Sequence, residues 1–255
     1  MTLEAHAKVN LTLEVGDLRP DGYHDLRSVV APISLFDVVE LEPADEIVDA
    51  GGIDFGAENL AVRAARALRR AAGVAAGVRI AVEKRIPMGA GLGGGSADAA
   101  ATLVGLDSLW GLGWGRERLM KVAEEVGSDV PALVHGGVVL MEGRGERVSG
   151  WNGAVDRRLL VLLKPPAHAS TPEVYREFRA EDRGLGANDL QPAACRLHPE
   201  IRLALEALAR AGGRDARMTG SGSAVFARAE DRAEAERIFE RLPGECWKAI
   251  AEVVA

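Results

Sequence analysis

Five of the eleven residues from Pro87 to Ala97 are glycine. Glycine adopts positive φ and has no Cβ, so successive backbone N–H groups can turn toward a single anion. Residues 96–109, rich in alanine and leucine, predict a helix directly after this run. Residues 78–84 alternate between apolar and polar types before it, which predicts a strand. The order of strand, glycine loop and helix predicts a phosphate site at a helix N-terminus.

Other interpretations of the glycine run are weaker. A flexible surface linker would be rich in serine and would lack flanking regular structure. A dinucleotide-binding loop would follow its strand directly, but residues 84–87 intervene here, and residues 110–113 break the chain where a second strand should begin. No Gly-Lys-Ser/Thr closes the run, which excludes a Walker loop. A phosphate loop without its own lysine needs a positive charge from elsewhere.

Lys8 is the candidate for that charge, because the chain contains only five lysines. Lys8, Asn10 and Thr12 alternate with apolar residues and therefore share one face of a predicted strand. The alternative is a solvated strand face that carries a lysine. Spacing alone does not decide between the two.

Two further segments carry polar residues between apolar neighbours. Asp129, in Gly-Ser-Asp-Val-Pro, lies at a predicted junction between loop and helix, where it is either an ordinary helix N-cap or a base or charge partner. The turn Thr-Gly-Ser-Gly-Ser at residues 219–223 separates two strand-like runs. By itself this turn is consistent with a hairpin that contains a bulge.

The blocks Ala-Lys-x-Asn, P-M-G-A-G-L-G-G-G-S and T-G-S-G-S occur here in one order. In this combination the chain resembles the GHMP small-molecule kinases, and the resemblance spans nearly its full length. Residues 19–24, Arg-Pro-Asp-Gly-Tyr-His, are most similar to members that phosphorylate a cytidine diphosphate-linked methylerythritol in the non-mevalonate isoprenoid route. Taken without the resemblance, residues 20–22 predict only a tight turn.

The resemblance implies a role for each block. Asp129 would be the general base, and Lys8 would pair with it while stabilising the transferred phosphoryl group. ATP would be the phosphoryl donor, used with Mg²⁺, and Asn59 would lie beside its adenine. The phosphates would lie against the loop formed by Pro87, Met88, Gly89, Ala90, Gly91, Leu92, Gly93, Gly94, Gly95, Ser96 and Ala97. The small-molecule substrate would contact Asn10 near its reacting end and a cytosine pocket made by Tyr23, His24, Thr171, Pro172 and Tyr175.

The chain also departs from the family pattern. Many members have a second serine where this chain has Ala97, so hydroxyl contact with phosphate depends on Ser96. No acidic residue clearly matches the magnesium ligand of other GHMP kinases. Asp98 is near, but as an early helix residue it can simply complement the helix dipole. The metal ligands are left unassigned.

Two alternatives to this activity remain. A GHMP kinase acting on another small polyol or on a mevalonate derivative would keep the three blocks but should lack the Tyr23, His24 and Tyr175 pocket. A non-catalytic nucleotide sensor would bind ATP without transferring phosphate. The presence of both Lys8 and Asp129 favours an enzyme.

Before the glycine loop, the sequence predicts strands over about residues 3–15, 26–33 and 38–41 and a helix over residues 58–72. The mixed order of predicted strands and helices along the chain indicates the α+β class. The family architecture is a ribosomal-protein-like N-terminal domain, here expected over residues 1–152, packed on a ferredoxin-like C-terminal domain over residues 153–255. The active site is expected between them.

Composition excludes several other classes. The net charge of −7 provides no basic field for nucleic acid. No secretory pattern opens the chain, and no apolar run reaches the roughly 18 residues of a membrane helix, so we expect a cytoplasmic protein without a membrane partner. The two cysteines form no C-x-x-C pattern, so the sequence predicts ordinary reduced thiols and neither a disulfide framework nor a zinc site. The sequence carries no signal for an oligomeric state.

Overall fold

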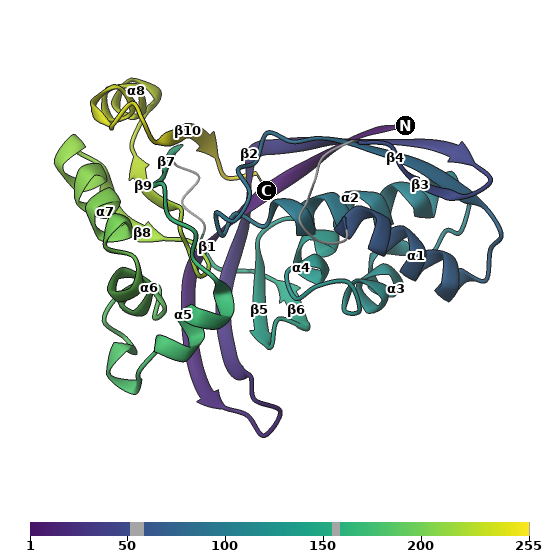
Figure 1. The fold of residues 1–255 in the computed structure, drawn as a ribbon, viewed down its shortest axis with the longest axis horizontal. Helices are drawn as coiled ribbons and strands as arrows, with labels where there is room; N and C mark the ends of the chain where they lie inside the picture. Colours follow the sequence, from purple (N-terminus) through teal and green to yellow (C-terminus); the bar gives the residue numbers. More distant parts are fainter. Residues whose placement is uncertain (52–58, 155–158, 255) are drawn as a thin grey trace.

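Two β-sheets form the framework of the molecule (Figure 1). The computed structural model describes residues 1–51, 59–154 and 159–254. The first sheet has the order β3-β4-β2-β5-β6, with β1 paired to β2. The second sheet has the order β10-β7-β9-β8. Their strands are β1 (Thr2–Leu18), β2 (His24–Ala44), β3 (Ile47–Asp49), β4 (Gly77–Glu83), β5 (Val139–Gly143), β6 (Arg147–Gly150), β7 (Leu159–Lys164), β8 (Arg214–Met218), β9 (Val225–Ala229) and β10 (Trp247–Glu252).

The helices form two groups, one with each sheet (Figure 1). The first group is α1 (Leu60–Ala72), α2 (Gly94–Leu109), α3 (Gly115–Ala123) and α4 (Val130–His135). The second is α5 (Thr171–Glu177), a 3₁₀ turn (Ala180–Asp182), α6 (Gln191–Leu197), α7 (Pro199–Ala211) and α8 (Arg232–Arg241). Helices therefore pack on sheets that are mostly antiparallel, which confirms the predicted α+β class.

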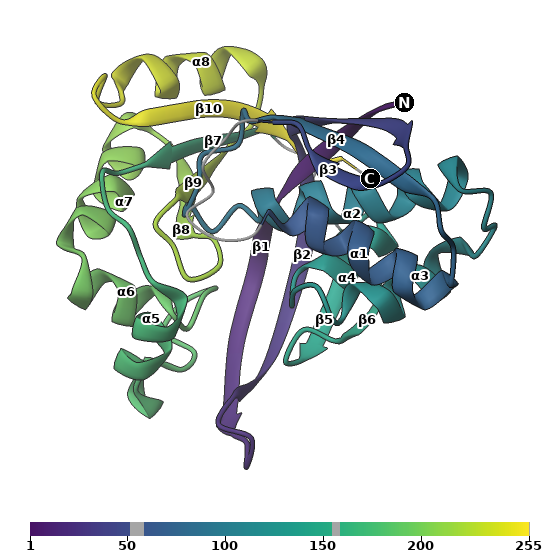
Figure 2. The same ribbon diagram turned by 45° about the vertical axis from the view of Figure 1, so that its right-hand side comes forward.

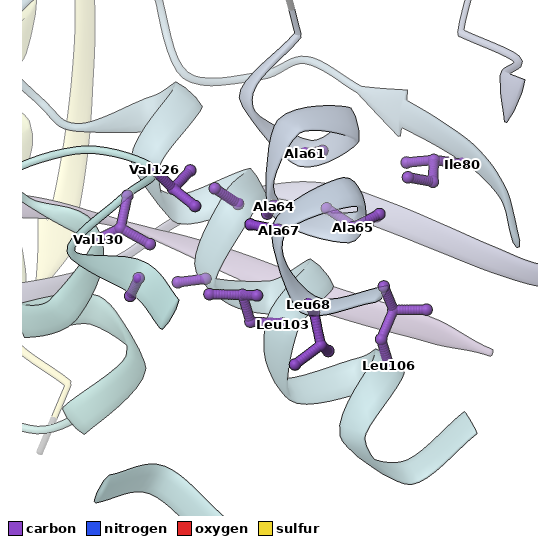
Figure 3. Packing of buried hydrophobic residues seen from close by; sticks show 14 of the residues in the cluster. Ala61, Ala64, Ala65, Ala67, Leu68, Ile80, Leu103, Leu106, Val126 and Val130 are labelled. Carbon is purple, nitrogen blue, oxygen red and sulfur yellow. The ribbon is translucent and has the colours of Figure 1, made fainter. Parts of the chain in front are cut away.

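Small residues on α1 let it pack closely on α2 (Figure 3). Ala61, Ala64, Ala65 and Leu68 are buried on one face of α1, where the alanines have no long side chain to hold the helices apart. The partner helix α2 contributes Leu103 and other buried residues from nearly its whole circumference. This helix pair gives the residues that precede α2 a rigid base.

Strand β1 belongs to both halves of the molecule. Ala5 packs in the core beneath α1 and α2, whereas Leu13 and Val15 pack in the second core with α7 and α8. Backbone hydrogen bonds join Leu13 to Ala187 and Asp189. A third cluster places Val9 against buried side chains of β7 and β9. The segment that contains Lys8 therefore lies where the two sheets meet, while the domain division at residues 152 and 153 stays a prediction.

The structure corrects two expectations about the elements. Strands expected over residues 26–33 and 38–41 are one continuous strand, β2, because the residues between them have tertiary partners, above all the buried carboxylate of Asp37. The helix expected from Glu58 begins at Leu60 behind the Asn59 cap, and Glu58 lies outside the described residues. Strands β3 and β6 and helix α6 were not predicted.

Candidate active site

A cavity of about 1140 Å³ lies between the two groups of elements. Figure 2 shows the long β1–β2 hairpin running between α5 on one side and β5 and β6 on the other. The cavity is lined from both sides of this hairpin. Of the residues predicted for the site, the lining contains Lys8, Asn10, Tyr23, His24, Asn59, the run from Pro87 to Ser96, Asp129, Thr171, Pro172 and Tyr175.

Lys8 and Asp129 meet across this cavity. The Lys8 Nζ lies 3.4 Å from Asp129 Oδ2. Lys8 is only 3% exposed, so it does not belong to a solvated strand face. The Asp129 side chain is 32% exposed, so a ligand can reach it. The pair places a positive charge and a proton acceptor side by side.

A chain of hydrogen bonds holds the Lys8 ammonium in place. Lys8 Nζ donates to Asn10 Oδ1 at 2.7 Å, and Asn10 Nδ2 donates to Ser28 Oγ at 2.7 Å. The Asn10 backbone N–H donates to Thr219 Oγ1 at 3.0 Å. Asn10 is buried, so its rotamer is fixed by these partners. Residues from β1, from β2 and from the turn at residues 219–223 thus meet at Asn10, which in turn accepts a hydrogen bond from the ammonium.

Asp129 occupies the N-cap position of α4, but its side chain accepts no hydrogen bond from the helix backbone. This separates the two interpretations that the sequence left open. The backbone of Asp129 has the position of a helix cap, but its carboxylate pairs with Lys8 and so has the position expected of a charge partner. The charge of Asp129 also reaches Tyr175, whose pKa is raised to about 12 mainly by burial and further by that charge.

The glycine loop, residues 87–97, is in close contact with the Thr-Gly-Ser-Gly-Ser turn. Gly91 has φ of +75°, and a Cβ there would lie 2.5 Å from the carbonyl oxygen of Thr219. Gly93 has φ of +69°, and its Cβ would lie 3.0 Å from the Lys8 Cγ. Both positions require glycine, because φ is positive and because a Cβ would lie too close to neighbouring atoms.

The N-terminus of α2 opens into the cavity. Gly93 is its N-cap residue, and Gly94, Gly95 and Ser96 form its first turn and line the cavity. N–H groups in the first turn of a helix have no partner within the helix and carry partial positive charge. Together with the neighbouring ammonium of Lys8, they favour an anion such as a phosphate. The structure does not bring Ala97 to the cavity, because it is buried and its N–H donates to Gly93.

Aromatic rings gather at the other end of the cavity. The His24 and Tyr175 rings stack with centroids 6.0 Å apart, and Phe178 meets His24 edge-on at 5.6 Å. His24 Nδ1 donates to the carbonyl oxygen of Gly16 at 3.0 Å. Tyr23 is 54% exposed, and the Arg144 guanidinium lies over its ring at 3.9 Å. These surfaces suit a planar, polar ring.

The remaining predicted residues, Thr171, Pro172 and Asn59, line the cavity, and Thr171 and Asn59 also contact neighbouring segments. Thr171 Oγ1 lies 2.7 Å from Ser221 Oγ, and Pro172 follows in the first turn of α5. Asn59 Oδ1 accepts a hydrogen bond from the N–H of Ala61. Its Nδ2 donates to Asp49 at 3.0 Å. Asn59 therefore caps α1 as well as lining the cavity.

The sequence analysis did not assign several lining residues to the site, among them Lys84, Asp98, Arg144, Phe178 and Ser221. Lysine scarcity, which singled out Lys8, applies equally to Lys84. Lys84 Nζ donates to Asp98 Oδ2 at 2.6 Å, and burial nevertheless raises the pKa of Asp98 to about 7. Arg144 carries no local signal, because only the turn between β5 and β6 brings it to Tyr23.

The described residues contain no group of three or more histidine, cysteine or acidic side chains that could hold a metal ion. Asp98, the acid nearest to the glycine loop in sequence, is engaged with Lys84. Mg²⁺ commonly binds through nucleotide phosphates and water with few protein ligands.

Comparison with known proteins identifies the family. The models for the GHMP kinases N terminal domain and the GHMP kinases C terminal match residues 59–137 and 170–249, which together exceed half of the chain. The chain belongs to the GHMP kinase family and is an ATP-dependent small-molecule kinase. Within the described residues, no helix has the length and apolar character needed to span a membrane.

Within this family, the chain groups with relatives that are named 4-diphosphocytidyl-2-C-methyl-D-erythritol kinase. The relative from Pelotomaculum thermopropionicum is 41% identical, with 94% of this chain and 93% of the relative covered. That from Symbiobacterium thermophilum is 40% identical, with 95% of each covered. A crystal structure of 4-(cytidine 5'-diphospho)-2C-methyl-D-erythritol kinase, 38% identical, matches with a TM-score of 0.86 and full coverage of both chains. Methanococcus jannaschii mevalonate kinase has 14% identity and a TM-score of 0.76, with 100% of this chain and 98% of that chain covered, and so shares the fold.

Proposed function

We propose that this kinase transfers the γ-phosphoryl group of ATP to the 2-hydroxyl of 4-diphosphocytidyl-2-C-methyl-D-erythritol. The observation that carries the proposal is the contact of Lys8 and Asp129 beside the N-terminus of α2. The names of the relatives support the choice of substrate. The alternative of a nucleotide sensor is disfavoured, because a sensor has no need for a base next to the phosphates.

Phosphoryl transfer needs alignment and charge stabilisation more than covalent chemistry by the protein. The N–H groups of the glycine loop and of the first turn of α2 hold the phosphates. Asp129 orients the hydroxyl and accepts its proton, and Lys8 stabilises the charge of the γ-phosphoryl oxygens. Asn10 fixes the ammonium and contacts the substrate near its reacting end. Asn59 lies beside the adenine.

The two ends of the substrate would meet different surfaces. The polyol lies at Asp129, and the cytosine lies among Tyr23, His24 and Tyr175, with Thr171 and Pro172 forming the wall. Aromatic rings stack on any planar base, so the polar groups around His24 select cytosine by its edge.

Mg²⁺ would accompany ATP, bound by its phosphates and water, with Ser96 nearby. We also propose a cytoplasmic location, because ATP is abundant there and both cysteines, Cys195 and Cys246, are free thiols. Neither proposal affects the roles of Lys8 and Asp129.

Phosphorus NMR of the reaction product tests the proposed function. The purified protein is mixed with ATP, Mg²⁺ and the diphosphocytidyl polyol, in parallel with the free polyol and mevalonate. We expect a new phosphomonoester signal on the 2-hydroxyl of the cytidylylated substrate alone. Transfer to mevalonate or to the free polyol instead would favour another GHMP activity, and ATP binding without any transfer would favour the sensor.

Tyr23→Ala tests the cytosine pocket. We expect KM for the cytidylylated substrate to rise about tenfold or more, since loss of base stacking costs roughly 1–3 kcal/mol, while KM for ATP stays unchanged. Steady-state kinetics with each substrate varied in turn measures both values. Because Tyr23 is exposed and packs little into the core, Tyr23→Phe serves as the matched control and should retain the wild-type KM. An unchanged KM in Tyr23→Ala would contradict stacking.

A further inference from the structure

Three charged side chains lie together at the base of the glycine loop without a role in the proposed chemistry. They are Asp37 on β2, Lys84 just after β4 and Asp98 on α2, and we call them the ionic clasp. Asp37 is fully buried, Asp98 is 1% exposed, and the Lys84 side chain is 14% exposed. Lys84 and Asp98 line the cavity.

Asp37 binds the segment that leads into the glycine loop. Its Oδ1 accepts the backbone N–H groups of Arg85 at 2.5 Å and Ile86 at 2.8 Å. Its Oδ2 accepts the ammonium of Lys84. One carboxylate from a distant strand thus fixes three successive residues directly before Pro87.

Lys84 extends this connection to the far side of the loop. Its ammonium also donates to Asp98 Oδ2 at 2.6 Å. Asp98 lies one turn into α2, the helix into which the loop leads. The clasp therefore joins the residues before the loop to the helix after it, and both ends of the loop are held through one ammonium group.

The composition of the clasp is unfavourable for stability alone. Two buried carboxylates share one ammonium, and Asp98 Oδ1 has no hydrogen-bond partner. Burial of unbalanced charge costs free energy, and apolar side chains of similar volume would often stabilise the fold as well or better. Desolvation is strong enough to raise the pKa of Asp98 to about 7. A cost of this kind at the edge of a ligand cavity indicates a function other than core packing.

The loop itself needs external support. Gly89, Gly91 and Gly93 all have positive φ, and glycine-rich backbone loses more conformational entropy on ordering than any other. A loop that is ordered before its ligand arrives binds more tightly, because the ordering cost is removed from the binding step.

We infer that Asp37, Lys84 and Asp98 are positioning residues that hold the glycine loop in its nucleotide-binding conformation. They raise the affinity for ATP by ordering the loop, and they make no contact with the acceptor hydroxyl. The inference rests on the proposed placement of the ATP phosphates in this loop.

The variant Lys84→Met/Asp98→Asn tests the inference. It opens the clasp with little change in volume and leaves Asp37 paired with two backbone N–H groups. We expect the Kd for a non-hydrolysable ATP analogue, measured by calorimetry, to rise about tenfold or more, as for a loop that holds its binding conformation a tenth of the time. KM for the acceptor should stay within twofold of wild type.

Asp182→Asn provides the matched control. Asp182 is a buried carboxylate paired with Arg196 at 2.8 Å, but it does not line the cavity. We expect it to lower the unfolding temperature without changing the Kd for the ATP analogue. If Lys84→Met/Asp98→Asn does not fold, Asp37→Asn, which keeps an oxygen for the backbone N–H groups, should raise that Kd in the same direction by a smaller factor.

Wild-type affinity for the analogue in a folded clasp variant would overturn the inference. The inference would also be overturned if the clasp variant raised the Kd for the analogue and the KM for the acceptor by the same factor and Asp182→Asn raised both values equally. Failure of the proposed function is distinguishable, because the wild-type protein itself would then bind no ATP analogue or transfer no phosphate.

Discussion

Replacement of Asp129 by asparagine is expected to lower kcat at least roughly a hundredfold, the scale for a positioned general base. The amide keeps the size of the side chain but cannot accept the proton of the hydroxyl. KM for ATP should change little, because the phosphates lie against the glycine loop. A coupled assay for ADP release, with both substrates saturating, measures kcat.

The control for this prediction is a second aspartate at a helix start. Asp231 caps α8, and its side chain accepts the N–H of Glu234 at 2.7 Å, whereas Asp129 makes no such bond in α4. Asp231→Ala should therefore cost about 1 kcal/mol of stability and leave kcat intact. Asp129→Ala should show the reverse pattern. Near-normal turnover in Asp129→Asn would remove this carboxylate from the mechanism.

Lys8→Met is expected to lower kcat roughly a hundred- to a thousandfold, as does removal of one preorganised charge-stabilising donor in other active sites. Methionine retains the apolar stem that packs beside Gly93 but lacks the ammonium. Loss of the charge also deprives Asp129 of its partner at 3.4 Å. Single-turnover kinetics separates the transfer step from product release, and the effect should appear in the transfer step.

The double variant Lys8→Met/Asp129→Asn shows whether the two residues act as one unit. Groups that cooperate in one transition state are strongly non-additive. We expect the double variant to be no more than about tenfold slower than the slower single variant. Rate losses that simply multiply would indicate that Lys8 and Asp129 serve separate steps.

Local sequence predicted the elements whose structure depends on their own residues. The glycines at positions 89–95 and the alanine-rich segment after them predicted a loop that leads into a helix, and α2 begins at Gly94. The α+β class and the family also followed from motifs and their order. Polar residues inside β2 misled the prediction. Asp37 interrupts the apolar pattern, and its buried carboxylate is compensated by the Lys84 ammonium and by the backbone N–H groups of Arg85 and Ile86, all from the segment after β4.

What the sequence alone determined was therefore the family, the class of fold and the blocks of residues that could meet a nucleotide, since φ preferences and apolar periodicity depend on near neighbours. The tertiary structure decided which of these residues meet. It placed Lys8 against Asp129, removed Ala97 from the cavity and brought Lys84 between Asp37 and Asp98. Such contacts depend on how two sheets and their helices pack through β1, and no local pattern encodes a distance between segments that are far apart in the chain.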